Sequence, residues 1–468
     1  QSMVSFPTDV GVLYYIFLDG FAKADNGNFV MTIGCASSCP QPAPSPTSKP
    51  GNLKNKKPTI PTPTFVKPAT PGNPNEPINQ PTMVISETPE YSFSDMPSSS
   101  ATEKDLFTSG SWRQIERINE QADCCTGKTL ALSSNKRFFA VSSPFSDWGF
   151  LEGAGRINIY RDNLLPTGAR SKVGGTIHGQ NYNEGLGSNI ALSGDGSILV
   201  ATNDTHVLTY RVFLSFWSKL NDESVTTTSS GKIALSSDGT VLAVSSDSFT
   251  IGSVKTFRLI NSRWVQIGGT ITANTLFSKV ESIALSGDGT VLAFGGSNFG
   301  AVVYYLKNNG AREEWNRFAS LSSSGNNFGN SLALSDDGKV LVVGEEGNIK
   351  TFHLNGPAGF WESRDRDIPY FNFGLQALPL SLSSNGTVLI LGNYDQDYDV
   401  ESDGQMDPGR ALAYHYDDDN LRWRQFGDLN ETRIAAQFGH GVAVSGDGTY
   451  LAVAALCYDG CTFIYQLE

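Results

Sequence analysis

The chain has 468 residues, a length that predicts two or three units. Its composition, with 39% hydrophobic residues, 17% charged residues and 48 glycines, is typical of a β-rich globular protein. The formal net charge of −13 argues against nucleic-acid binding, because that binding needs Lys and Arg to neutralise phosphates. No apolar stretch reaches the roughly 18 residues that span a bilayer, so no transmembrane segment is predicted.

Residues 1–37 predict a β-hairpin that is not a complete domain. One strand runs through 13–21 (LYYIFLDGF), the other through 27–33 (GNFVMTI), with a loop at 22–26. A lone hairpin is marginal in water, so its sheet continues upstream in a longer precursor or in a neighbouring molecule. The pattern YYIFLDGF…GNFVMTI…C resembles the closing strands of the bacterial pre-peptidase C-terminal β-sandwich. The start at Gln1, without a signal-peptide pattern, is what we expect of a mature or trimmed piece.

Residues 38–104 are rich in proline, threonine and serine. Segments such as PQPAPSP from Pro40 and PTIPTPT from Pro58 favour polyproline II, which has no internal hydrogen bonds. The composition predicts an extended, semi-rigid stalk.

Residues 105–468 repeat one pattern seven times, an apolar run, a short turn and a second apolar run. The clearest copies are 190–202 (IALSGDGSILVAT), 233–245 (IALSSDGTVLAVS), 283–295 (IALSGDGTVLAFG) and 442–454 (VAVSGDGTYLAVA). A serine closes the first run at positions 133, 193, 236, 286, 335, 383 and 445, at intervals of 43 to 62 residues. A strand-built repeat of this length predicts an all-β fold, a seven-bladed β-propeller.

Each blade is predicted to have four strands. In the fourth copy, the first two strands are predicted at 283–286 and 291–295, and the turn between them takes its backbone geometry from Asp288 and Gly289. The third strand is predicted at 301–306, and the outer strand begins at Trp315. Similar Trp-led strands begin at Trp112, Trp217, Trp264, Trp361 and Trp423. Because these tryptophans recur in register, we predict that they pack between blades rather than bind sugars. Only three strands fit after the seventh repeat, so 112–118 is predicted to supply the fourth and close the ring.

The phrase ALSGDGTVLAV, preceded in two copies by Phe328-Gly329 and Phe438-Gly439, resembles the FG-GAP repeat of integrin α-subunit propellers. It is most similar to secreted FG-GAP-like proteins of microalgae. The resemblance covers roughly residues 105–468 and implies extracellular adhesion or assembly. Integrin-type blades bind calcium in a longer Asp-rich loop between the first two strands. Here that loop is a turn with one Asp, such as Asp195, too few for the six to eight oxygens that Ca²⁺ takes, so no calcium site is carried over.

One acidic insertion, between the second and third strands of the sixth blade, is a candidate cation site. It carries Asp395, Asp397, Asp399, Glu401, Asp403 and Asp407. Carboxylates and carbonyls at this spacing could wrap a hard cation, although Val400 stands where an EF-hand needs Gly. The alternatives are bound calcium and a solvated acidic loop. No cofactor is required, and calcium is the one cofactor that the sequence suggests.

Six cysteines occur in three close pairs, Cys35/Cys39, Cys124/Cys125 and Cys457/Cys461, without the His partners of a zinc site. Such pairs favour disulfides and an oxidising compartment. A bridge from the second pair to the third would fasten the ring at its closure, and a local Cys457–Cys461 link is the alternative. The first pair forms a small local loop or half of a bond to something outside the chain.

Sequons at Asn203, Asn385 and Asn430 predict N-glycosylation and, with the cysteines, an extracellular location, secreted or at the cell surface. No catalytic motif occurs. The five histidines, at 178, 206, 353, 415 and 440, are scattered without paired spacing, and there is no nucleophile elbow or phosphate-binding glycine loop. We therefore predict that the protein is not an enzyme.

Together these features predict a non-enzymatic extracellular structural protein, a subunit of a filament, surface appendage or matrix. Self-association through the hairpin and the Pro-rich stalk would build the polymer, with strand edges at 14–17 and 30–33 available for β-augmentation, and the propeller would be displayed. The alternative is a secreted adhesive or glycan-binding propeller that uses its loops near 144–155 and 393–409. A third hypothesis is the non-catalytic part of a secreted hydrolase. The fold alone does not decide between them, because the chemistry of a propeller lies in its loops.

Overall fold

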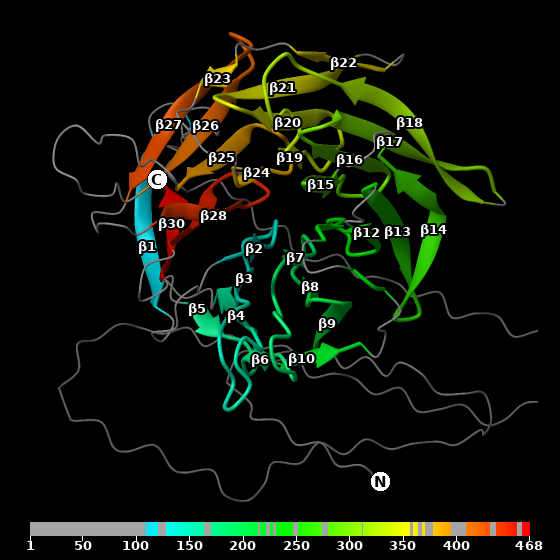
Figure 1. The fold of residues 1–468 in the computed structure, drawn as a ribbon. Helices are drawn as coiled ribbons and strands as arrows, with labels where there is room; N and C mark the ends of the chain where they lie inside the picture. Colours follow the sequence, from blue (N-terminus) through cyan, green and yellow to red (C-terminus); the bar gives the residue numbers. More distant parts are fainter. Residues whose placement is uncertain are drawn as a thin grey trace, which may run out of the picture. The chain divides into compact units, whose positions relative to one another are not determined.

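A computed structural model describes residues 107, 110–119, 128–162, 170–213, 216–220, 225–227, 231–246, 251–273, 279–310, 312–355, 359–363, 367–369, 378–394, 409–430, 437–455 and 461–468. The predicted hairpin of 1–37 and the predicted stalk of 38–104 lie outside these residues. Within them, the chain forms the seven-bladed β-propeller that the repeat predicts, with seven antiparallel sheets around one axis (Figure 1).

The first four blades follow the chain in order. Blade 1 contains β2 (Leu130–Leu132), β3 (Phe138–Ser143), β4 (Arg156–Asp162), β5 (Arg170–Lys172) and β6 (Ile177–His178). Blade 2 contains β7 (Ile190–Leu192), β8 (Ile198–Thr202), β9 (Val207–Phe213) and β10 (Phe216–Lys219). Blade 3 contains β11 (Ile233–Leu235), β12 (Val241–Ser246), β13 (Ser253–Ile260) and β14 (Arg263–Thr272). Blade 4 contains β15 (Ser282–Leu285), β16 (Val291–Gly296), β17 (Gly300–Asn308) and β18 (Glu313–Leu321).

The remaining blades complete the ring. Blade 5 contains β19 (Ser331–Leu334), β20 (Val340–Glu345), β21 (Asn348–Asn355), β22 (Phe360–Ser363) and β23 (Ile368–Pro369). Blade 6 contains β24 (Leu380–Leu382), β25 (Val388–Asn393), β26 (Arg410–Asp417) and β27 (Arg422–Asn430). Blade 7 contains β28 (Phe438–Val444), β29 (Tyr450–Ala455), β30 (Cys461–Leu467) and β1 (Trp112–Asn119). The short strands β6 and β23 were not predicted, and each pairs with the third strand of its blade.

The ring closes within blade 7, as the sequence predicts. Strand β1 pairs antiparallel with β30, from Trp112 opposite Leu467 to Asn119 opposite Cys461. Beyond the last pair, the backbones of Ser111 and Glu468 exchange hydrogen bonds of 2.9 and 3.0 Å. Figure 1 shows the two strands side by side, β1 in cyan and β30 in red. Closure from both ends of the propeller segment gives the third strand of the last blade a partner instead of an exposed edge.

Neighbouring blades are held together by shared apolar clusters. Among the described residues there is one cluster at each of the seven interfaces between blades. The second strands are the most buried, and every residue of β16 is buried. Because both faces of such a strand are covered by adjacent blades, its sequence is continuously apolar rather than alternating.

The turn between the first two strands is built alike in each blade. In blade 4, the Asp288 carboxylate accepts hydrogen bonds from the Ser286 hydroxyl (2.7 Å) and the Thr290 N–H (2.9 Å). Burial alone would raise the pKa of Asp288, but these bonds outweigh it and hold the pKa below its ordinary value. Gly289 has a φ of +68°, and a Cβ there would lie 2.5 Å from Val241 of the preceding blade. The aspartate therefore shapes the turn, as predicted.

The turns that follow the seven repeated serines form a ring of backbone hydrogen bonds around the axis. In the described part of the chain, each of the seven blades donates one such bond of 2.7 to 3.1 Å to a neighbouring blade; the donor and acceptor residues are Gly194 to Ser237, Asp238 to Gly287, Gly287 to Asp336, Asp336 to Ser384, Ser384 to Gly446, Gly446 to Ser134 and Asn135 to Gly194. A Cβ at Gly446 would lie 2.7 Å from Ser384 Oγ, so the ring favours small residues. These turns draw the blades together at one end of the axis.

Candidate functional site

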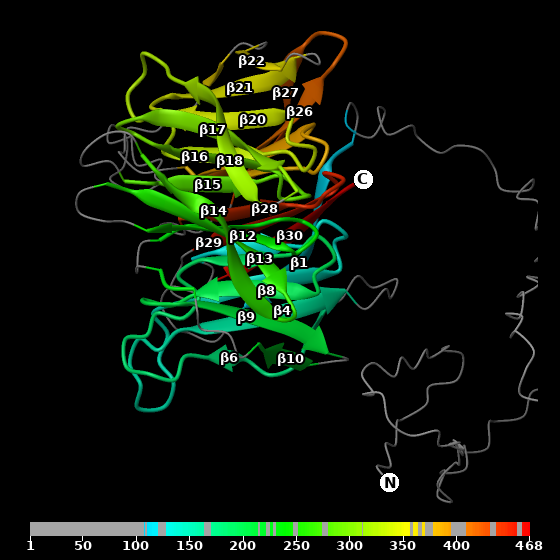
Figure 2. The same cartoon turned by 90° about the vertical axis from the view of Figure 1, so that its right-hand side faces the viewer.

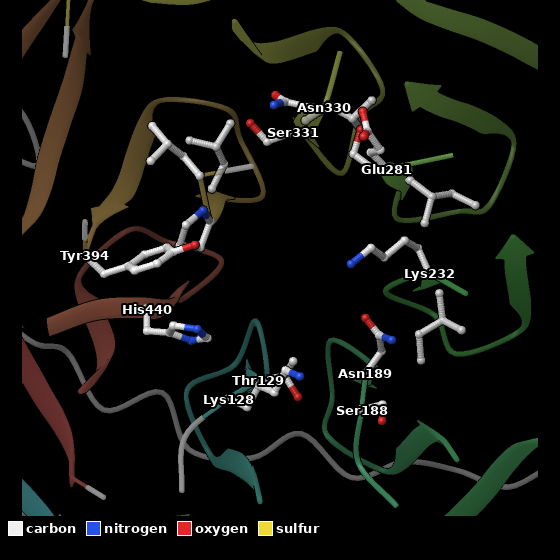
Figure 3. Close-up of a pocket in the computed structure, with 17 residues that line it drawn as sticks. Lys128, Thr129, Ser188, Asn189, Lys232, Glu281, Asn330, Ser331, Tyr394 and His440 are labelled. Atoms are coloured by element: carbon white, nitrogen blue, oxygen red, sulfur yellow. The ribbon is translucent and has the colours of Figure 1, made fainter. Parts of the chain in front are cut away.

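A pocket of 510 Å³ opens on the axis at the other end, where the first strand of each blade begins (Figure 3). Every blade contributes, with lining residues at or just before β2, β7, β11, β15, β19 and β24, and with His440 in β28. The volume lies within the range of small-molecule sites. Loops between blades, and between second and third strands, emerge at this end, which we call the loop face. Figure 2 shows the propeller from the side, with the chain's C terminus at one face.

The described lining carries more positive than negative side chains. Lys128 comes from the start of blade 1 and Lys232 from the start of blade 3, and Figure 3 shows the Lys232 ammonium extending toward the middle of the pocket. Glu281 is the one carboxylate among the described lining residues, and its Oε2 accepts hydrogen bonds from the N–H and the hydroxyl of Ser297, both 2.8 Å long. The pocket therefore favours a negatively charged occupant, although the whole chain is acidic.

Opposite Lys232, the rings of Tyr394 and His440 form an aromatic wall (Figure 3). The ring centroids lie 4.7 Å apart. Burial, together with the charge of Lys128, lowers the pKa of His440 to about 4. The imidazole is therefore neutral at pH 7 and offers a hydrogen-bonding nitrogen rather than a charge.

A second feature of the loop face is a set of exposed aromatic side chains in blade 1. Phe145, Trp148 and Phe150 lie on the loop from β3 to β4, and Tyr182 lies on the connection to blade 2. Phe150 is fully exposed, and the other three are 52 to 59% exposed. The Trp148 ring stacks on His178 at a centroid distance of 3.5 Å. We call these four aromatic residues the blade 1 platform.

Backbone hydrogen bonds between three loops hold the platform in place. The N–H of Asn183 donates to the Glu152 carbonyl (2.8 Å), and that of Leu186 to the Ala154 carbonyl (3.1 Å). The N–H of Asp204 in blade 2 donates to the Glu184 carbonyl (3.1 Å). The Tyr182 hydroxyl also donates to Glu152 Oε2 (3.0 Å). The exposed rings are thus presented by an ordered support, which lowers the entropy lost when a partner binds.

The platform is acidic. Its supporting loops, 144–155, 179–189 and 203–206, contain four carboxylates, Asp147, Glu152, Glu184 and Asp204, and no Lys or Arg. Burial and the neighbouring Glu184 raise the pKa of Asp204. The platform borders the axial pocket at Lys128, whose Nζ lies 4.3 Å from the centroid of the Phe145 ring.

The predicted calcium ligands, Asp395, Asp397, Asp399, Glu401, Asp403 and Asp407, lie outside the described residues, so calcium binding stays a prediction. The residues described on the two sides of the insertion are Tyr394, which lines the axial pocket, and Gly409. Among the residues that the structure describes, no three His, Cys, Asp or Glu side chains form a group that could hold a metal ion.

Of the six cysteines, only Cys461 lies within the described residues. It is buried at the start of β30, and Arg117 of β1 donates to its Sγ at 3.0 Å. Cys461 therefore lies beside the strand that closes the ring, the place that a bridge from the Cys124/Cys125 pair to the Cys457/Cys461 pair was predicted to fasten. The predictions for Cys35, Cys39, Cys124, Cys125 and Cys457 lie outside the described residues, and the pairing stays open.

The three sequon asparagines differ in environment. Asn385 and Asn430 are exposed. Asn203 is buried, and its side-chain amide donates to Glu184 Oε1 at 2.8 Å. A glycan on Asn203 would have to replace that bond, so glycosylation there would disturb the support of the platform.

Sequence reasoning missed the residues that line the axial pocket. Lys232, Glu281 and Asn330 each stand directly before a first strand. Their register relative to the repeat would have placed them at one end of the axis, because that position is equivalent in every blade. The loop at 144–155 was predicted to carry recognition, but its aromatic residues were not singled out.

No protein-family model matches the chain, and no curated protein matches it. In the described part of the chain, no helix is long and apolar enough to cross a membrane.

Proposed function

We propose that this chain is a non-enzymatic extracellular structural protein, a subunit of a filament, surface appendage or matrix, in which the blade 1 platform docks a neighbouring copy. The observation that carries the proposal is the platform itself, four exposed aromatic side chains on an ordered, acidic support. Aromatic side chains supply much of the binding energy at protein interfaces. Exposed apolar side chains that gather on one surface mark a site of interaction.

The chain contains a segment with complementary chemistry. Residues 36–75 carry Lys49, Lys54, Lys56, Lys57 and Lys67 and no Asp or Glu. Proline-rich segments bind to aromatic surfaces in a preformed extended conformation, and lysines pair with surrounding carboxylates. We propose that this segment of one copy lies on the platform of the next. Such a contact joins two different surfaces, so repeating it builds a filament of subunits, unless the subunits close into a cyclic oligomer.

We also propose that the propeller is of the FG-GAP type. Phe328 and Phe438 are buried, and the glycines that follow them have φ values of +96° and +92°. A Cβ at Gly439 would lie 2.2 Å from the carbonyl oxygen of Arg410, so the Phe-Gly pair serves a close approach between blades. Extracellular location, disulfides, N-glycosylation and calcium in the insertion of blade 6 belong to the same proposal.

Sedimentation velocity of the full chain over a range of concentrations tests the docking. We expect concentration-dependent association that weakens at high salt, because charges contribute to it. Phe150→Ser should weaken association about tenfold or more, since the loss of an aromatic anchor costs roughly 2 kcal/mol. Phe360→Ser, at an exposed aromatic of the outer strand β22, is the matched control and should change nothing.

A mixing experiment tests the two-sided nature of the contact. A Phe150→Ser chain keeps its lysines, and a chain with Lys56→Glu and Lys57→Glu keeps its platform. We expect neither variant to polymerise alone and the mixture to form one-to-one dimers. A wild-type chain that stays monomeric at all concentrations, or a Phe360→Ser effect as large as that of Phe150→Ser, would refute the proposal.

The alternative, a secreted adhesive or glycan-binding propeller, is favoured by a different observation, the axial pocket.

A further inference from the structure

The axial pocket concentrates positive charge in an otherwise acidic chain. Lys128 and Lys232 line it from two different blades, while Glu281 is engaged by two hydrogen bonds from Ser297. The net charge of the whole chain is −13, so a local excess of ammonium groups is not a consequence of composition. Inside a pocket, where water is partly excluded, an ammonium group attracts an anion more strongly than it does on an open surface.

Neutral polar groups complete the lining. Asn330 and Ser331 are 9 and 6% exposed, and their amide and hydroxyl groups belong to the pocket lining. His440 Nδ1 is buried and has no hydrogen-bond partner among the described residues. A buried polar atom without a partner is costly, so His440 Nδ1 favours an occupant that bonds to it, and Asn330 and Ser331 offer further polar groups beside it.

The aromatic wall of Tyr394 and His440 lies across the pocket from Lys232 (Figure 3). Such a wall suits an occupant with an apolar face as well as polar groups, and the imidazole adds no charge because its pKa is lowered to about 4. The pocket has room for a molecule of the size of a sugar.

We propose that the axial pocket binds a small anionic ligand, a sugar-sized molecule with a carboxylate or sulfate group that pairs with Lys232 and Lys128. Lysine serves such groups as a compact point charge with three donors. Asn330, Ser331 and His440 bond to the polar body of the ligand. The inference does not rest on the docking of copies, because Lys232 belongs to blade 3 and not to the blade 1 platform.

Calorimetric titration of the full chain with glucuronic acid, glucose 6-sulfate and glucose tests the ligand class. We expect at least one of the two anionic probes to bind about tenfold more tightly than glucose, and the difference to shrink at high salt. The carboxylate and sulfate probes show which anion the pocket prefers.

Two variants tie binding to the pocket. Lys232→Gln should weaken binding of the anionic probe about tenfold or more, and Asn330→Ala should weaken binding of all probes. Lys307→Gln, an equal charge change at an exposed residue of β17, should leave binding unchanged.

Three outcomes would overturn the proposal. They are equal affinity for glucose and the anions, no binding of any probe up to about 10 mM, and equal effects of Lys232→Gln and Lys307→Gln. A wild-type chain that binds the anionic probe but does not self-associate would refute only the proposed docking of copies.

Discussion

At the scale of single residues, His440 shows how the position of a side chain sets its charge. The ring lies in the pocket wall between Tyr394 and Lys128, with its pKa lowered to about 4 by burial first and by the lysine second. In the unfolded chain the ordinary value is about 6.5. Between these two values the unfolded chain binds a proton that the folded chain does not, so acid favours unfolding.

We therefore predict that His440 makes the free energy of unfolding fall as the pH drops from about 6.5 to about 4, by at most roughly 3 kcal/mol. Above pH 6.5 His440 is neutral in both the folded and the unfolded chain, so it causes no loss of stability there. Denaturant titrations at pH 7, 5.5 and 4.5 measure it. His440→Gln should flatten this part of the profile, whereas His206→Gln, in a loop of blade 2, should leave it unchanged. A profile that is the same in wild type and His440→Gln would contradict the prediction.

At the scale of strands, six tryptophans join each outer strand of blades 2 to 7 to the preceding blade. Three indole N–H groups donate to a threonine hydroxyl of the neighbouring third strand, Trp264 to Thr209 (2.8 Å), Trp315 to Thr256 (2.6 Å) and Trp423 to Thr351 (2.8 Å). Trp217, Trp361 and Trp112 pack instead in clusters with Ile159, Val303 and Ala413, and within the described residues their indole nitrogens have no partner. Packing between blades, which the sequence predicts, is confirmed.

This difference predicts opposite effects of two substitutions. Val303→Thr should stabilise the propeller by about 0.5–1.5 kcal/mol, because it offers the Trp361 N–H an acceptor. Thr351→Val should destabilise it by about 1–3 kcal/mol, because it leaves the Trp423 N–H buried without one. Chemical denaturation measures both. In a Trp361→Phe background, Val303→Thr should lose its benefit; destabilisation by Val303→Thr in the wild-type background would show that the hydroxyl does not reach the indole.

At the scale of the whole molecule, stability depends on the closure between β1 and β30. Ile118 of β1 is buried in the cluster between blades 7 and 1, and Trp112 packs in the cluster between blades 6 and 7. Blade 1 has Arg170 where other blades have tryptophan, and this buried guanidinium lies 3.3 Å from Glu116 of β1. One strand thus contributes to the last sheet and to both of its interfaces.

We predict that a chain beginning at residue 105 keeps a cooperative thermal transition, whereas a chain beginning at residue 121 loses it or aggregates. Without β1, the edge of β30 and two apolar clusters are exposed. Scanning calorimetry with light scattering measures both outcomes. The same transition in both truncated chains would show that closure contributes little.

The repeated serine, the Asp-Gly turn and the incomplete seventh repeat determined the architecture by themselves. They are local signals, because a turn such as that at Asp288 and Gly289 needs only neighbouring residues, and Ser286 lies two positions from its partner. The closing strand was predictable because a ring allows one place for a spare strand with the same Trp-led pattern.

Only the tertiary structure decided the candidate sites. Lys128, Lys232 and His440 lie far apart in the sequence and meet because each lies within two residues of the start of a first strand. No local pattern states which blades carry a charge there. Trp148 and Tyr182 belong to loops of irregular length, whose exposure depends on hydrogen bonds between loops. The sequence alone determined the ring, because its signals repeat at short range; long-range packing decided which side chains face the pocket, the platform or the core.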